Sequence, residues 1–205
     1  MRKEFRFAVY PLLGIGIILS VLILVIWSQG KEREPVQVGE MQEYRDPGIG
    51  FSIQYPRGWI ANAQVGRAYF YNDHDVEQKF LDPRGSHAAG VVIAITAKKT
   101  SDVATTIKKF RGELAASGSI VGTEEIVMVG KHQGVKFPYT ASFDAKSVVR
   151  GYHILIAADS VLYDLGVAGF GDRFDAYTMV FDASLGSFQF PEQHEQGKGG
   201  SEEAI

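Results

Sequence analysis

Residues 7–27 form an apolar segment that contains no Asp, Glu, Lys, Arg or His. At a rise of about 1.5 Å per residue, a helix of this length spans roughly 30 Å, the hydrocarbon thickness of a bilayer. A helix satisfies its backbone hydrogen bonds within one segment, as a lipid environment requires. The pattern therefore predicts one transmembrane helix. Its membrane-anchoring side chains include Phe7, Leu13, Ile18, Leu24 and Trp27.

Basic residues lie mainly on the N-terminal side of this segment. Residues 1–6 hold three basic side chains and one acidic one, whereas residues 31–34 hold two of each. Because Lys and Arg beside a span tend to stay cytoplasmic, we expect a single-pass membrane protein with an extracytoplasmic domain, in the periplasm or at the cell surface. A cleaved signal peptide ending near residues 28–30 is the alternative. An apolar region of 21 residues exceeds the roughly 7–15 of signal peptides, which favours a retained anchor.

Alternating and periodic patterns predict one domain over residues 44–190, between a polar linker at 28–43 and a disordered tail at 191–205. Strand-like runs occupy residues 51–55, 68–71, 90–97, 126–129, 135–143, 148–158 and 161–168, and 188–190 could add a last strand. Amphipathic helices are expected at residues 103–114 and 174–185. Ser101 or Asp102 can cap the first of these helices, and Pro138 indicates a sheet edge or a bulge.

Composition excludes some functions. The formal net charge of −3 offers no basic field for nucleic acid, so we expect no nucleic-acid partner. The chain has no cysteine, which excludes disulfides and a lipid-modified cysteine after the apolar segment. No nucleophile elbow, HExxH helix or P-loop is present, and Gly169-x-Gly171 fits a turn better than a dinucleotide motif. The sequence therefore identifies no catalytic or cofactor-binding residues.

The densest polar cluster lies in residues 72–89, which are predicted to form a long loop. It contains Asp73, His74, Asp75 and His87. Carboxylate oxygens suit calcium or manganese, and imidazoles suit transition metals, so these four residues are the candidate metal ligands. The cluster lacks the ligand order and central glycine of an EF-hand loop. A solvated loop without metal is the competing interpretation.

A few other side chains have two interpretations each. Trp59, Tyr69 and Tyr71 form a candidate binding surface, although aromatic residues in a domain without cysteine also serve as core. His153 lies in an apolar strand, where a hydrogen-bonded structural histidine is the alternative to a catalytic one.

Two sequence patches resemble the PsbP family, whose fold is shared with Mog-type Ran-binding proteins and bacterial DcrB-like exported domains. The first consists of Tyr44-Arg45-Asp46-Pro47, Gly50-Phe51-Ser52-Ile53-Gln54-Tyr55-Pro56 and Gly58-Trp59. The second consists of Tyr163-Asp164-Leu165 and Gly186-Ser187-Phe188-Gln189-Phe190. The resemblance implies an α+β domain with an antiparallel β-sheet flanked by helices, an α/β/α sandwich preceded here by one transmembrane helix.

The resemblance implies a non-catalytic role. Plant and cyanobacterial PsbP proteins assist the oxygen-evolving centre of photosystem II, and other members bind protein partners. The transmembrane anchor departs from that photosynthetic pattern, and fold analogy alone does not transfer function. We expect an accessory or protein-interaction module with a protein partner in or at the membrane. A calcium- or manganese-binding exported protein and an unrecognised hydrolase are the alternatives.

Overall fold

The computed structural model describes residues 34–81, 90–100, 102–143 and 147–191. The described residues from 35 onward belong to one compact unit. The predicted anchor at residues 7–27 lies outside the described residues. Among the described helices, none is long and apolar enough to cross a membrane.

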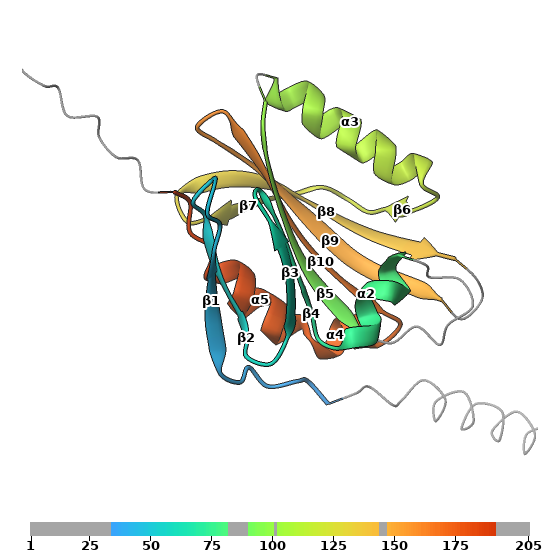
Figure 1. Cartoon of the computed structure of the whole chain (residues 1–205). Helices are drawn as coiled ribbons and strands as arrows, with labels where there is room; N and C mark the ends of the chain where they lie inside the picture. The colour runs from blue at the N-terminus through green and yellow to red at the C-terminus, as the bar shows by residue number, and fades with distance from the viewer. Residues whose placement is uncertain (1–33, 82–89, 101, 144–146, 192–205) are drawn as a thin grey trace, which may run out of the picture. The chain divides into compact units, whose positions relative to one another are not determined.

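One antiparallel sheet organises the domain (Figure 1). The strands are β1 (Met41–Arg45), β2 (Ser52–Pro56), β3 (Ile60–Gln64), β4 (Arg67–Tyr71), β5 (Val91–Lys99), β6 (Ile120–Val121), β7 (Glu125–Val129), β8 (His132–Ser142), β9 (Val148–Ala158) and β10 (Val161–Phe170). Their order across the main sheet is β3-β4-β5-β10-β9-β8-β6, and β7 also pairs with β8. The hairpin β1–β2 forms a separate two-stranded sheet. The strands with the most buried residues, β5, β9 and β10, are therefore central.

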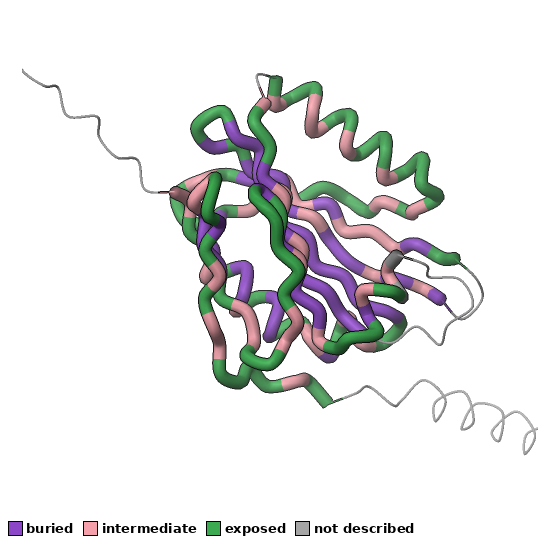
Figure 2. Tube along the Cα trace, in the orientation of Figure 1, coloured by how far each residue is buried: buried purple, intermediate pink, exposed green. Residues whose placement is uncertain are grey.

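The helices cover both faces of this sheet. They are α2 (His74–Leu81), α3 (Val103–Ala116), α4 (Arg173–Ala176) and α5 (Thr178–Gly186). On one face, Phe51, which immediately precedes β2, and Phe181 of α5 join the largest apolar cluster. On the other face, Val76 and Phe80 of α2 pack in a second cluster, and Ile107 and Phe110 of α3 pack in a third. Figure 2 shows buried residues concentrated along the central strands.

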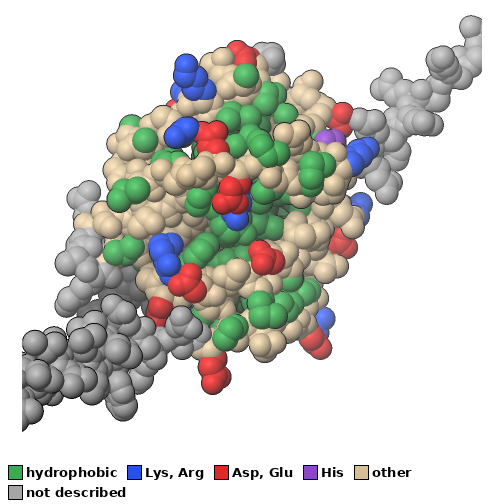
Figure 3. Space-filling view, turned by 180° about the vertical axis from the view of Figure 1, so that it is seen from behind, with side chains coloured by type: hydrophobic (Ala, Val, Ile, Leu, Met, Phe, Trp, Pro, Cys, Tyr) green, Lys and Arg blue, Asp and Glu red, His purple; other side chains and the backbone are tan. Residues whose placement is uncertain are grey.

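The face seen from behind differs from the one that carries α2 and α3. Hydrophobic side chains gather near its middle and are interrupted by acidic and basic ones (Figure 3). Lys136 and Tyr152 belong to this side of the sheet, with the ammonium 4.4 Å from the ring centroid. Arg150 lies 5.8 Å from the Phe174 ring and forms an ion pair with Asp175.

Helix α3 follows its sequence pattern. The side chain of Asp102 accepts a 3.0 Å hydrogen bond from the Thr105 N–H, so Asp102 is the cap of the predicted pair Ser101 or Asp102. The helix ends at Ala116 with Ser117 as its C-cap, and Gly118 adopts a φ of +87°. Pro138 lies where the outer neighbour of β8 changes from β7 to β6, which fits its missing N–H.

Several elements differ from the sequence expectation. The prediction of an uninterrupted loop at residues 72–89 is wrong over α2. The helical pattern there is weak, because Val76 and Phe80 are the only apolar side chains of α2 that lie one turn apart. The patterns also missed β1, β3 and β6. The predicted helix at 174–185 is divided at Tyr177 into α4 and α5. Residues 188–190 contribute an isolated bridge to Ser52, not a strand.

Candidate functional site

A cavity of about 400 Å³ lies beside α2, and we call it the α2 pocket. Its lining residues are Asn62, Gln64, Arg67, Tyr69, Tyr71, Glu77, Phe80, Val92 and Ala94. The sheet brings them together because Asn62 is the cross-strand partner of Tyr69, and Tyr69 that of Ala94. Gln64 is likewise the partner of Arg67. The volume falls within the roughly 300–1,000 Å³ of small-molecule sites.

The polar groups of the α2 pocket include one fixed pair. The Asn62 amide donates a 2.5 Å hydrogen bond to the Glu77 carboxylate, which links β3 to α2. Burial and then the charge of Glu77 raise the pKa of Tyr71 to about 12. Tyr71, like a tyrosine with an ordinary pKa, keeps its phenolic proton at neutral pH and is available as a hydrogen-bond donor. The rings of Tyr69 and Tyr71 lie 6.4 Å apart and nearly parallel, at 14°.

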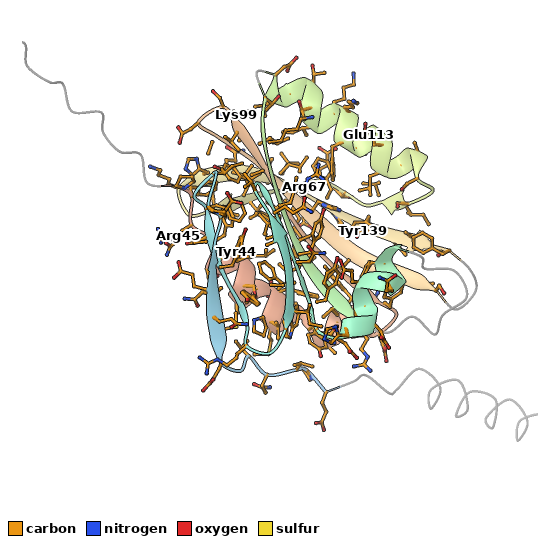
Figure 4. The ribbon with its side chains drawn as sticks, in the orientation of Figure 1. Tyr44, Arg45, Arg67, Lys99, Glu113 and Tyr139 are labelled. Carbon is orange, nitrogen blue, oxygen red and sulfur yellow. The ribbon has the colours of Figure 1, made fainter. Side chains whose placement is uncertain are left out.

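Arg67 supplies the cationic group of the α2 pocket. Its side chain extends from the start of β4 on the face that Figure 4 presents. Within the described residues it forms no side-chain ion pair, whereas Glu77 is already engaged by Asn62. A guanidinium presents a planar set of donors that matches carboxylate or phosphate groups. The arrangement can therefore hold an anionic group next to an aromatic surface.

A histidine–carboxylate pair lies on the same face of the sheet. Nδ1 of His153 is 2.8 Å from Oδ1 of Asp164, and the two side chains are 20% and 22% exposed. The His153 ring also contacts the Phe110 ring edge-on at 4.9 Å and stacks with Tyr139 at 5.3 Å. Burial and then the charge of Asp164 raise the pKa of Tyr139 to about 12.

Gly166 provides the room for this pair. It is the cross-strand partner of both His153 and Ala94, so it separates the pair from the α2 pocket. A Cβ atom added at Gly166 would lie 3.1 Å from Nδ1 of His153. The glycine therefore allows the imidazole to lie close to the sheet and reach Asp164.

The pair supplies two parts of a familiar catalytic arrangement. A carboxylate that orients a histidine corresponds to the base and orienting group of a hydrolase triad. Within the described part of the chain, the side-chain contacts of His153 are to Asp164 and to aromatic rings, and they include no Ser, Thr or Cys nucleophile. As it stands, the arrangement can position a polar group.

The structure brings together some of the residues predicted from sequence. Tyr69 and Tyr71 both line the α2 pocket, whereas Trp59 packs on the opposite face, with its ring 6.0 Å from that of Tyr177. The sequence did not indicate Arg67 or Gln64 as site residues, because the sequence of a five-residue strand does not show which strands and helices lie next to it.

Of the candidate metal ligands, Asp73 immediately precedes α2, and His74 and Asp75 begin it. His87 lies outside the described residues. Among the described side chains, no group of three or more His, Asp or Glu residues is close enough to hold a metal ion. The metal site therefore stays a prediction.

Solved structures share this fold. Cyanobacterial PsbP (CyanoP) from Synechocystis sp. PCC 6803 has a TM-score of 0.50 and 19% identity, covering 78% of this chain and 99% of that chain. LpqN, involved in cell envelope biogenesis of Mycobacterium tuberculosis, has a TM-score of 0.51 and 13% identity, covering 75% and 93%. The Ran-binding protein Mog1p of Saccharomyces cerevisiae has a TM-score of 0.49 and 13% identity, covering 74% and 95%.

The matches differ in how much of the other protein they cover. The chain covers about half, 51%, of a Bacteroides thetaiotaomicron protein, to which it is 13% identical over 78% of its own length with a TM-score of 0.47. No protein-family model and no curated protein matches the chain. At these identities the likeness to solved structures establishes the fold alone. The chain has a PsbP/Mog1p-like fold, α+β with a large antiparallel sheet and helices, as the sequence resemblance predicted.

Proposed function

We propose that the chain is a membrane-anchored, extracytoplasmic, non-catalytic accessory or protein-interaction module of a membrane-associated assembly. The observation that carries this proposal is the α2 pocket. It combines the Arg67 guanidinium, which has no ion-pair partner within the described residues, with the Gln64 amide and the Tyr69 ring. Arginine and tyrosine side chains recur at the centres of protein interfaces, where one group binds charge and the other supplies contact area.

The sequence outside the described residues supports the location. The apolar segment at 7–27 holds the chain at a membrane, and the basic N-terminus favours the extracytoplasmic side for the domain. LpqN, which shares the fold, is involved in cell envelope biogenesis of Mycobacterium tuberculosis. We use LpqN only to support a cell-envelope location for this chain and transfer no activity from it, because a fold does not specify a function.

Site-specific photocrosslinking in native membranes tests the proposal. A photoreactive amino acid replaces Gln64 at the α2 pocket of the full chain, and the matched control replaces Glu113, an exposed residue of α3 (Figure 4). We expect one protein adduct at near-stoichiometric yield from position 64 and none from position 113. The adduct should disappear in Arg67→Ala. Equal labelling at both positions, or no adduct at position 64, contradicts the proposal.

A hydrolase is the second candidate, and the His153–Asp164 pair is the observation that favours it. If the pair is catalytic, the purified full chain should turn over a panel of ester, amide or glycoside substrates. His153→Gln and Asp164→Asn should then each lower the rate by at least about 100-fold, the size of a general acid–base contribution. Turnover that both variants retain would exclude this pair as its source.

A further inference from the structure

Strand β7 is an unprotected edge of the main sheet. It pairs on one side with β8, from Glu125 opposite Lys136 to Val129 opposite His132. Within the described residues no strand pairs with its other side. An edge strand presents a row of free backbone N–H and C=O groups, which is a template for another strand.

The hairpin register identifies which groups face outward. Gly130 and Lys131 form a two-residue turn, so the flanking pair Val129 and His132 exchanges backbone hydrogen bonds. Hydrogen-bonded and non-hydrogen-bonded pairs alternate along an antiparallel ladder. Ile126 and Met128 are therefore the residues whose N–H and C=O groups point away from β8.

The side chains of the same two residues are exposed. Ile126 is 65% exposed and Met128 is 63% exposed, which is high for large apolar side chains on a strand. Edge strands in monomeric proteins are protected by charged side chains, above all lysine, by proline or by a bulge, and the sequence EIVMV has a charge only at Glu125 and no lysine or proline. The opposite edge differs, because β3 reads IANAQ and exposes only small or polar side chains at residues 61–64.

We propose that β7 pairs with β7 of a second copy of this chain, antiparallel and about a two-fold axis at Val127. This register pairs all five residues of the strand. It places Ile126 opposite Met128 of the second copy, and the two-fold axis repeats that contact. The outward N–H and C=O groups of these residues then satisfy each other, and the two sheets become continuous.

Charge supports an identical strand as the occupant. Glu124 and Glu125 stand at the start of β7, where they form ion pairs with Arg111 and Lys136 of the same chain, and Lys131 lies in the turn after its end. Antiparallel pairing about Val127 brings the acidic start of each copy beside the basic turn of the other. A two-fold contact of one patch with itself is the commonest way in which soluble chains form dimers. The dimer rests on β7 alone and is independent of the α2 pocket.

Cysteine crosslinking of the full chain in membranes tests the register, because the chain has no cysteine of its own. In Val127→Cys the two thiols face each other in a non-hydrogen-bonded pair, where Cα atoms are about 4.5 Å apart, within disulfide range. In Ile126→Cys the two cysteines are offset by two residues along the paired strands, so their thiols are too far apart to form a disulfide. We expect a mild oxidant to give at least tenfold more crosslinked dimer with Val127→Cys. A mixture of Ile126→Cys and Met128→Cys should crosslink as well.

A second measurement guards against an effect of the cysteine itself. Ile126→Lys should convert the purified full chain from dimer to monomer in sedimentation experiments. Ile120→Lys, on the neighbouring strand β6 where Ile120 is 76% exposed, is the matched control and should leave the dimer intact. Equal crosslinking of Val127→Cys and Ile126→Cys overturns the proposal. So does a monomeric wild-type chain, or a Val127→Cys adduct with a different protein only.

Discussion

Asp46, in the turn between β1 and β2, accepts a 2.7 Å hydrogen bond from the backbone N–H of Gly66 in the β3–β4 turn. The other oxygen of its carboxylate accepts from Gly48 at 2.9 Å and from Ile49 at 2.5 Å. Asp46 is only 1% exposed. A single buried carboxylate thus joins the separate β1–β2 hairpin to the main sheet.

Removing this carboxylate should destabilise the domain. In Asp46→Ala the N–H groups of Gly48, Ile49 and Gly66 lose their acceptor, and unsatisfied buried donors are costly. We expect the free energy of unfolding to fall by about 2–3 kcal/mol, measured by urea denaturation of the full chain. Glu43→Gln is the control, since Glu43 has an exposed ion pair with Arg45. It should change stability by less than about 0.5 kcal/mol. Equal effects of both variants would contradict this role of Asp46.

The same group should make stability depend on pH. Burial alone would raise the pKa of Asp46, but hydrogen bonds from the N–H groups of Ile49, Gly66 and Gly48 outweigh it and hold the pKa below its ordinary value of 3.8. A lowered pKa in the folded state stabilises above the unfolded pKa, and the effect is lost as pH falls through the folded value. The stability difference between wild type and Asp46→Asn should stay constant from pH 7 to 5 and shrink below about pH 4. A difference at pH 2 as large as that at pH 7 would contradict this assignment.

The buried strands were predictable because their patterns depend on burial. β9 and β10 form long apolar runs, and they occupy central positions with a neighbour on each side. β1 and β3 have few buried residues and are held mainly by pairing of their backbones, so their side chains carry little signal. Helix α2 escaped detection because its eight residues contain only three large apolar side chains, Val76, Phe80 and Leu81, too few for a clear helical pattern.

The candidate site was predictable only in part. Tyr69 and Tyr71 were singled out as aromatic residues, but their neighbours Asn62 and Gln64 depend on the β3–β4 register. His153 was noted without its partner, because Asp164 reaches it only through the register of the β9–β10 hairpin. That register is set at residues 159–160, where both φ values are positive, at 50° and 62°. Neither Asp159 nor Ser160 is glycine, which is why the turn type was hard to read from sequence.

Adding one methyl group should have opposite effects at two glycines. In Gly166→Ala the new Cβ lies 3.1 Å from Nδ1 of His153, so the imidazole must shift by about a few tenths of an ångström, which strains its hydrogen bond to Asp164. We expect a loss of about 1–3 kcal/mol in unfolding free energy. Gly112 lies within α3, where an added methyl group would meet no atom within 4 Å, and Gly112→Ala should gain about 0.5–1 kcal/mol. Urea denaturation measures both. A neutral Gly166→Ala would show that His153 can move freely.

The metal prediction can be tested directly. If Asp73, His74, Asp75 and His87 bind calcium or manganese, calorimetric titration of the full chain should give saturable heat and a raised melting temperature at millimolar ion. Asp73→Asn combined with Asp75→Asn should remove both signals, while the control Asp159→Asn should not. No heat and no change in melting temperature with calcium, manganese or zinc would exclude the site and leave a plain solvated segment.

The topology of the chain can be tested by protease accessibility. Three basic residues and one acidic residue precede the apolar segment at 7–27, whereas residues 31–34 hold two basic and two acidic residues. The domain should therefore lie outside the cytoplasm. Protease added to intact spheroplasts should digest residues 44–190, whereas a cytoplasmic control protein survives. The double variant Arg2→Glu, Lys3→Glu reverses the charge bias. In a fraction of its molecules the domain should lie in the cytoplasm, where the protease cannot reach it. A retained anchor predicts that the membrane form keeps residues 1–30 by mass spectrometry, since a cleaved signal peptide would remove them. A wild-type domain that is protected until the membrane is permeabilised would reverse the topology and, with it, the extracytoplasmic setting of the proposed function.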